Sequence, residues 1–87
     1  MEQYKLSLQT YLGAFAKSLR LRSGLSQERM AELLRITARS YSDLERRQSC
    51  FSTQTFLFLL FLLPEDEMLQ LLRNLRALLD EVDHAAV

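Results

Sequence analysis

The sequence predicts an all-α fold, and its composition supports this prediction in two ways. Leucine occurs 20 times in 87 residues, whereas isoleucine and valine together occur three times. Because strands favour β-branched residues, this composition excludes a mainly β fold. The chain also contains only two glycines and one proline, so few residues suit turns. We therefore expect five helices in one small domain with a thin core.

The first helix is expected over residues 10–22, where apolar residues recur at helical spacing. Gly24 suits the left-handed residue that ends such a helix. Residues 1–9 either extend this helix or form an N-terminal arm, and the sequence leaves both alternatives open.

Two short helices are expected next, over residues 27–34 and 38–47. Ser26 and Thr37 directly precede them, and a hydroxyl at this position accepts a hydrogen bond from an amide of the first turn. Two capped helices joined by about three residues are typical of a helix-turn-helix motif.

The last two helices are expected over residues 55–63 and 64–82. The first of them is apolar on every side, which is not expected of a helix on a protein surface. Pro64 suits the first turn of the second, and three acidic residues follow it where the helix dipole favours negative charge. The chain thus divides into a helix-turn-helix domain over residues 10–63 and a C-terminal helical segment over residues 64–87.

The formal charge is zero, but it is unevenly divided. Residues 1–50 carry nine Lys or Arg and five acids, and residues 51–87 carry two Arg and six acids, so the halves have net charges of +4 and −4. Such asymmetry is typical of a protein with one surface facing a polyanion. On charge alone, a merely solvated surface is the simpler interpretation.

Several function classes are not expected. Cys50 is the only cysteine and His84 the only histidine, so we expect no disulfide, no metal site and a reducing compartment. The sequence offers no nucleophile–base pair or phosphate loop, so we predict neither an enzyme nor a cofactor. The longest apolar run, residues 56–63, is far too short to span a bilayer, and no signal peptide opens the chain. A soluble, cytoplasmic protein without a membrane partner is expected.

Eighteen positions share one ungapped register with a known family. They are Leu12-Gly13, Leu19-Arg20, Gly24-Leu25-Ser26-Gln27, Met30-Ala31, Ile36-Thr37 and Tyr41-Ser42-Asp43-Leu44-Glu45-Arg46. In this register residues 12–64 resemble the Cro/cI-type helix-turn-helix domain of the XRE family. The resemblance implies a lambda-repressor-like bundle that binds double-stranded DNA, with the fourth helix running from Thr55 to Leu63. The chain departs from the family at Arg47, where the family usually has glycine, and a non-glycine residue there must pay to enter the left-handed conformation.

The second helix of such a motif presents its N-terminal turn to the major groove. Tyr41 and Leu44 are expected in the core, so the candidates for base reading are Thr37, Ala38, Arg39, Ser40 and Asp43. Arg39 is the leading candidate, since a guanidinium group can bond both O6 and N7 of guanine. The resemblance places Ala38, Arg39 and Asp43 at the family's principal base-reading positions. Ala38 offers only a methyl contact, and Asp43 repels phosphate unless it accepts from cytosine or orients Arg39.

Phosphate contacts are expected at the two ends of the motif. The first amides of the helix over residues 27–34 and the Gln27 side chain suit a phosphate, and the family uses this glutamine for that contact. A helix cap alone is the alternative interpretation of Ser26 and Gln27. The candidates for phosphate contact are Ser26, Gln27, Arg46, Arg47 and Gln48. The resemblance also implies a largely buried, structural ion pair between Arg20 and Glu45.

The second half of the chain has more apolar residues than one small domain can cover, which predicts a homodimer. The candidates for its interface are Phe58, Phe61, Met68, Leu72, Leu75, Leu79 and Val82. A two-fold dimer sets two recognition helices about 34 Å apart on a pseudo-palindromic site. The alternative is that the last helix folds back over Phe58 and Phe61 within one monomer.

Two functions follow from these observations. The leading prediction is a sequence-specific DNA-binding transcriptional regulator that represses by occlusion. The alternative is a protein-interaction module, of an antitoxin or mobile-element type, that has kept the fold without strong DNA binding. Zero net charge, Ala38 and Asp43 favour the alternative, in which the last two helices bind a different protein.

Overall fold

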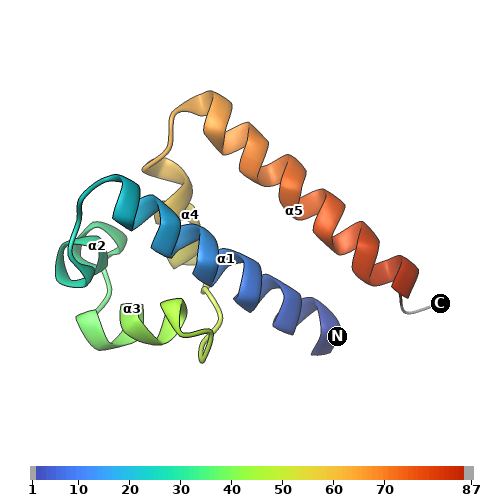
Figure 1. Cartoon of the computed structure of the whole chain (residues 1–87), viewed down its shortest axis with the longest axis horizontal. Helices are drawn as coiled ribbons and strands as arrows, with labels where there is room; N and C mark the ends of the chain where they lie inside the picture. Colours follow the sequence, from blue (N-terminus) through green and yellow to red (C-terminus); the bar gives the residue numbers. More distant parts are fainter. Residues whose placement is uncertain (1, 86–87) are drawn as a thin grey trace.

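The computed structural model describes residues 2–85, which form five α-helices and no strand (Figure 1). The helices are α1 (Glu2–Arg22), α2 (Gln27–Leu34), α3 (Ala38–Glu45), α4 (Thr53–Phe61) and α5 (Glu65–Ala85). The prediction of an all-α helical bundle is therefore confirmed.

Helix α2 has the expected bounds, and α1 ends at Arg22 as expected. Helix α1 begins at Glu2, so the first residues extend the helix instead of forming an arm, and Met1 lies outside the described residues. Helix α3 ends at Glu45, earlier than the expected residue 47.

The expected bounds of the last two helices were also wrong. Helix α4 begins at Thr53 because the Ser52 hydroxyl accepts a hydrogen bond from the amide of Thr55 (3.1 Å). It ends at Phe61, two residues before the expected end. Helix α5 continues to Ala85, past the expected residue 82, and residues 86–87 of the C-terminal segment lie outside the described residues.

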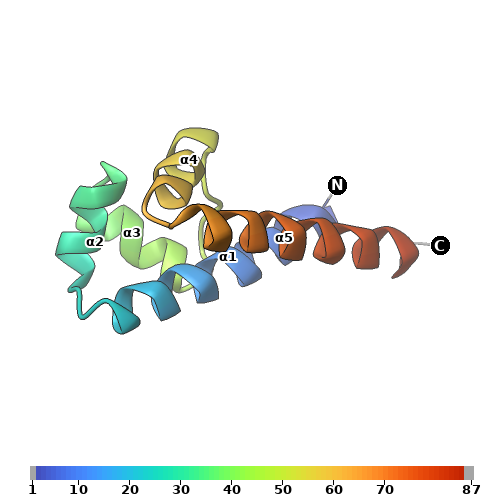
Figure 2. The same cartoon turned by 90° about the horizontal axis from the view of Figure 1, so that it is seen from above.

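Helix α1 contacts both α3 and α5. Helices α3 and α5 lie on opposite sides of α1 in Figure 1. Helix α5 runs back along α1 in the opposite direction, so the two ends of the chain lie at the same end of the molecule in both views (Figures 1 and 2). This arrangement leaves the outer face of α3 clear of α5.

Gly13 allows α1 and α3 to approach closely. A Cβ atom at this buried position would lie 2.5 Å from the main-chain oxygen of Leu44, near the end of α3. No side chain can occupy that space, so the glycine sets the separation of the two helices.

All five helices contribute to one core. Its largest fully buried side chains are Met30, Leu34, Tyr41, Leu59 and Leu71. Helix α5 adds Leu71 and Leu75 to this cluster, so α5 covers its own chain. The assignment of Leu75 to a dimer interface was therefore wrong: its side chain is only 8% exposed, because this face of α5 packs on the core of the same chain. No helix of residues 2–85 is long and apolar enough to cross a bilayer.

Candidate nucleic-acid interface

The helix-turn-helix motif is built by local hydrogen bonds. The Ser26 hydroxyl accepts from the amide of Arg29 (3.1 Å) and caps α2, and the Thr37 hydroxyl accepts from the amide of Ser40 (3.0 Å) and caps α3. Between them, Arg35 takes the left-handed conformation with φ of 62°, which ends α2 abruptly. The two caps and this turn fix the direction in which α3 leaves α2.

Helix α3 has one buried and one exposed face. Tyr41 and Leu44 point into the core, whereas the first turn of the helix is exposed. The exposed residues of this turn are Thr37, Ala38, Arg39 and Ser40. The Thr37 hydroxyl donates to the Ser40 hydroxyl (2.9 Å), so these two groups are already linked. Among the described residues, Arg39 has no hydrogen-bond or ion-pair partner, and its guanidinium group is free to contact a ligand.

Asp43 lies one turn further along α3 and is half-buried. Its carboxylate accepts a hydrogen bond from Nη2 of Arg46 (2.9 Å). The structure thus pairs Asp43 with Arg46, whereas orienting Arg39 was one of the two roles expected of Asp43 from the sequence. Both arginines lie within helical reach of Asp43, at spacings of three and four residues, so spacing alone does not choose between them.

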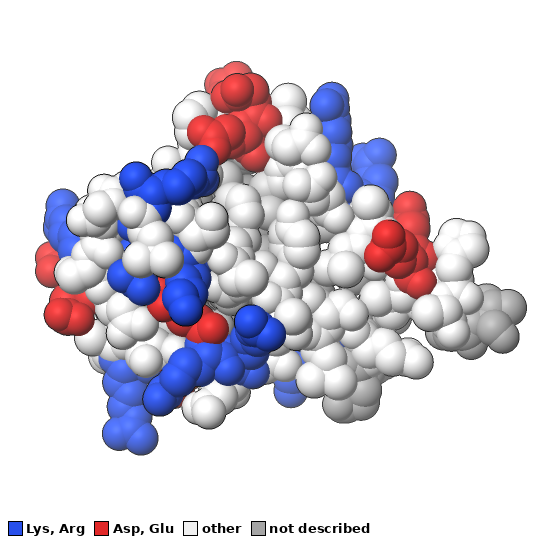
Figure 3. Space-filling model, viewed as in Figure 1, with Lys and Arg blue, Asp and Glu red and all other residues white. Residues whose placement is uncertain are grey.

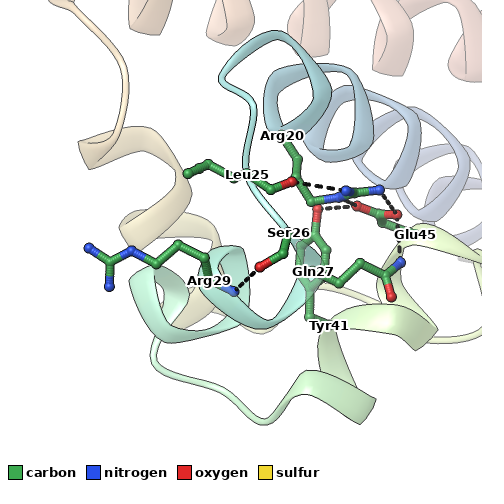
Figure 4. A network of polar contacts seen from close by, with 7 residues as sticks. All are labelled: Arg20, Leu25, Ser26, Gln27, Arg29, Tyr41 and Glu45. Carbon is green, nitrogen blue, oxygen red and sulfur yellow. Dashed lines mark hydrogen bonds and ion pairs between the residues drawn. The ribbon is translucent and has the colours of Figure 1, made fainter.

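A polar network joins the end of α3 to α1 and α2 (Figure 4). The Arg20 guanidinium holds the Glu45 carboxylate by two hydrogen bonds, from Nε to Oε2 (2.6 Å) and from Nη2 to Oε1 (3.1 Å). Its third donor, Nη1, reaches the main-chain oxygen of Leu25 (3.1 Å). The Tyr41 hydroxyl also donates to Oε2 of Glu45, and Nε2 of Gln27 donates to Oε1 (3.0 Å). With side chains 12% and 4% exposed, Arg20 and Glu45 lie largely away from water.

This network sets the charges of its members. Burial alone would raise the pKa of Glu45, but the hydrogen bonds from Arg20, Tyr41 and Gln27 outweigh it and hold that pKa below its ordinary value. The hydrogen bond to Glu45 raises the pKa of Arg20. Burial, together with the bond to Glu45, raises the pKa of Tyr41. Around neutral pH, Glu45 is therefore a carboxylate and Tyr41 a neutral donor.

The network also orients the first side chain of α2. Gln27 is half-buried, and one hydrogen of its amide group is bonded to Glu45. A glutamine amide has two N–H donors, so one remains for a second partner. Gln27 is thus held in place at the start of α2, where main-chain amides are also unpaired within the helix.

Positive charge gathers over this part of the molecule. In Figure 3, Lys and Arg atoms are concentrated on the left, over α2 and α3, with a few acidic atoms among them. Beyond the end of α3, Arg46, Arg47 and Gln48 are all exposed. A surface that combines a capped helix with flanking cations is suited to a polyanion such as DNA.

A family model described as a helix-turn-helix domain matches residues 11–85. The chain belongs to the helix-turn-helix domain family. No match to a curated protein or to a solved structure was found. The matched residues run from α1 through α5, and membership of this family indicates a DNA-binding regulator.

The helix-turn-helix domain of this chain forms the turn after α3 without glycine. Arg47 adopts the left-handed conformation with φ of 62°, and the amide of Gln48 donates to the main-chain oxygen of Asp43 (2.9 Å). Arg47 therefore forms this turn at some cost in backbone strain, at the position where the resemblance noted in the sequence implied glycine. The same residue places a further cation beside α3.

Sequence reasoning missed Arg35, which closes α2. Its guanidinium lies 4.4 Å from the centre of the Phe58 ring, a cation–π contact that joins the turn of the helix-turn-helix domain to α4. Phe58, assigned from sequence to the dimer interface, is half-buried in this position and packs against the core of its own chain. Spacing along the chain carries no signal for a contact between residues 23 positions apart.

Proposed function

We propose that the protein is a transcriptional repressor that binds a specific DNA sequence as a homodimer. The observation that carries this proposal is the position of Arg39. Its side chain is exposed on the first turn of α3, without a partner among the described residues, while Tyr41, Leu44 and Glu45 fix the rest of the helix to the protein. A helix held in this way can present one guanidinium group to a guanine in the major groove.

The flanking groups support a contact with the DNA backbone. Gln27 keeps one amide hydrogen free at the start of α2, next to unpaired main-chain amides, and this combination suits a phosphate oxygen. At the other end of α3, Arg47 and Gln48 are exposed. Arg46 is exposed as well, but its guanidinium group forms an ion pair with Asp43. These contacts position the helix and carry little sequence information.

Repression by occlusion and a pseudo-palindromic operator are part of the same proposal. A two-fold dimer places its two α3 helices about one turn of DNA apart, so each reads one half-site. Its support is the apolar surface outside the DNA-facing side, where large residues of α4 and α5 are exposed. They are Leu57, Phe61, Leu69 and Leu72.

The test is binding of duplex DNA selected from a random pool, measured by fluorescence anisotropy with the wild-type chain and Arg39→Ala. We expect selection of a two-fold symmetric site, and a loss of about 10- to 100-fold in affinity for that site in Arg39→Ala. The matched control is Arg73→Ala on α5, which removes the same charge far from α3 and should bind as the wild type does. If Arg39→Ala and Arg73→Ala bind the selected duplex equally, Arg39 does not read bases and the proposal fails.

A second candidate is a protein-interaction module. The ion pair between Asp43 and Arg46 favours it, because it neutralises one of the cations on the reading side. In this case binding to duplex DNA is absent even at about 50 mM salt, where counterion release favours any protein–DNA contact. Measurable binding that weakens steeply between about 50 and 200 mM salt excludes this candidate.

A further inference from the structure

Four exposed residues of α5 form a stripe along one side of the helix. They are Glu65, Leu69, Leu72 and Arg76, spaced by four, three and four residues. At 100° per residue they lie within an arc of about 60°. This stripe is separate from the face that carries Leu71 and Leu75 into the core.

The stripe carries exposed apolar side chains and charged side chains that take part in no ion pair within the described part of the chain. Leu69 and Leu72 are 54% and 42% exposed, although both are large apolar side chains. Among residues 2–85, neither Glu65 nor Arg76 takes part in an ion pair, whereas the nearby Glu67 is paired with Arg22 of α1. The charges that flank the two leucines are therefore available to a partner.

The order of these four residues is self-complementary. A second copy of α5 lying antiparallel, with the two-fold axis between residues 70 and 71, brings Leu69 opposite Leu72 of the second copy. The same register brings Glu65 opposite Arg76 of the second copy, because the two pairs share one midpoint. By two-fold symmetry each contact is made twice. A parallel arrangement instead sets Glu65 against Glu65 and Arg76 against Arg76, which repel.

We infer that the stripe of Glu65, Leu69, Leu72 and Arg76 is an antiparallel, two-fold interface between two copies of this chain. In this register the last nine residues of α5 in the second copy extend about 13 Å past the start of α5, toward the junction with α4. Phe61, the last residue of α4, is 66% exposed at that junction. The face of α3 that carries Arg39 is not part of the interface, since α3 and α5 lie on opposite sides of α1 (Figure 1).

This inference rests on the homodimer of the proposed function and names its surface, its orientation and its register. It changes the set of interface residues expected from the sequence. Leu72 remains, Leu75 belongs to the core, and Glu65, Leu69 and Arg76 are added.

The test is charge reversal, read by sedimentation equilibrium of the full chain without DNA. Glu65→Arg sets arginine against arginine at both ends of the stripe, and Arg76→Glu sets glutamate against glutamate. For each variant alone, the dissociation constant of the dimer should be about tenfold or more higher than that of the wild type. An equimolar mixture of the two should dimerise as the wild type does, because every contact is then between opposite charges. The double variant should also dimerise.

Glu81→Arg is the matched control, since it changes the same charge on the same helix about 150° away from the stripe. It should dimerise as the wild type does. Circular dichroism melting checks that Glu65→Arg, which adds positive charge at a helix N-terminus, remains folded. If it does not fold, Arg76→Glu alone, compared with the Glu81→Arg control, decides.

Several outcomes overturn the inference. A wild-type chain that is monomeric at about 100 μM, single variants that dimerise unchanged, or a mixture that stays monomeric would each do so. These results are distinguishable from failure of the proposed function, which is read from Arg39 and DNA. A wild-type dimer insensitive to charge reversal, together with DNA binding that depends on Arg39, leaves the repressor in place and moves its interface elsewhere.

Discussion

Arg20 of α1 and Glu45, the last residue of α3, are joined by two parallel hydrogen bonds of 2.6 and 3.1 Å. Glu45 in turn holds Tyr41 of its own helix and Gln27, the first residue of α2. One carboxylate therefore connects α1, α2 and α3. Its main role is to fix α3 on the protein, and the position of Arg39 depends on it.

Loss of this ion pair should destabilise the fold. Arg20→Ala leaves Glu45, only 4% exposed, without its main cation. We expect the free energy of unfolding in urea to fall by about 3 kcal/mol, because a largely buried charge without its partner is costly. Arg29→Ala is the control, since its pair with Glu32 is exposed and is worth less than about 0.5 kcal/mol. Equal losses in the two variants would contradict a structural role for Arg20.

Stability should also fall in acid, and Glu45 should be responsible. Its pKa lies below the ordinary 4.5 because the hydrogen bonds from Arg20, Tyr41 and Gln27 outweigh the effect of burial. The unfolded chain then binds this proton more readily than the folded one, so the stabilisation is complete above 4.5 and is lost as the pH falls through the lowered pKa. Urea unfolding between pH 7 and about 3 measures this loss.

Two variants that replace a carboxylate with a carboxamide test whether Glu45 causes the loss of stability in acid. Glu45→Gln is less stable at neutral pH but should show a shallower decline below 4.5. Glu32→Gln removes an exposed carboxylate and should keep the slope of the wild type. If the free energy of unfolding of Glu45→Gln falls with pH as steeply as that of the wild type, other groups cause the acid sensitivity.

Gly13 should not tolerate even one methyl group. In a helix, alanine is normally better than glycine by about 1 kcal/mol. At this position, however, the new Cβ lies 2.5 Å from the main-chain oxygen of Leu44, so α1 and α3 must separate. We expect Gly13→Ala to lower the free energy of unfolding by about 2 kcal/mol or more, from chemical denaturation.

Gly24→Ala gives a useful comparison. Gly24 has φ of 69°, and the position that a methyl group would occupy there is open space, so alanine meets only backbone strain. That strain costs about 1 kcal/mol. A stabilised Gly13→Ala would show that the two helices are not in close contact at Leu44.

Asp43 should limit non-specific binding to DNA. Its carboxylate lies on α3 and neutralises Arg46 through a 2.9 Å hydrogen bond. Asp43→Asn removes a negative charge and releases Arg46, so affinity for a random duplex should rise and the logarithmic salt slope should steepen by about 0.9 for each added phosphate contact. Ser42→Ala, a neutral change on the same helix, serves as control. An unchanged salt slope in Asp43→Asn would mean that Arg46 does not reach phosphate.

The sequence by itself determined the helix-turn-helix motif and the buried side of α3. The Ser26 and Thr37 caps act on amides three residues away, so their signal is local and can be read from spacing. The inward positions of Tyr41 and Leu44 follow from the helical period in the same way. The start of α4 was misplaced because Ser52, a cap of the same kind, was not recognised as one.

The tertiary structure decided which side chains from different helices contact one another. Glu45 bonds to side chains of α1 and α2, Arg35 contacts the Phe58 ring, and Leu75 lies in the core of its own chain. Each of these contacts depends on the distance and angle between helices, and Gly13 sets one such distance through the close approach of α1 to α3. Helical periodicity identifies which residues share a face, but it contains no information about which other helix that face meets. That choice is made only when the apolar faces of all five helices are buried together.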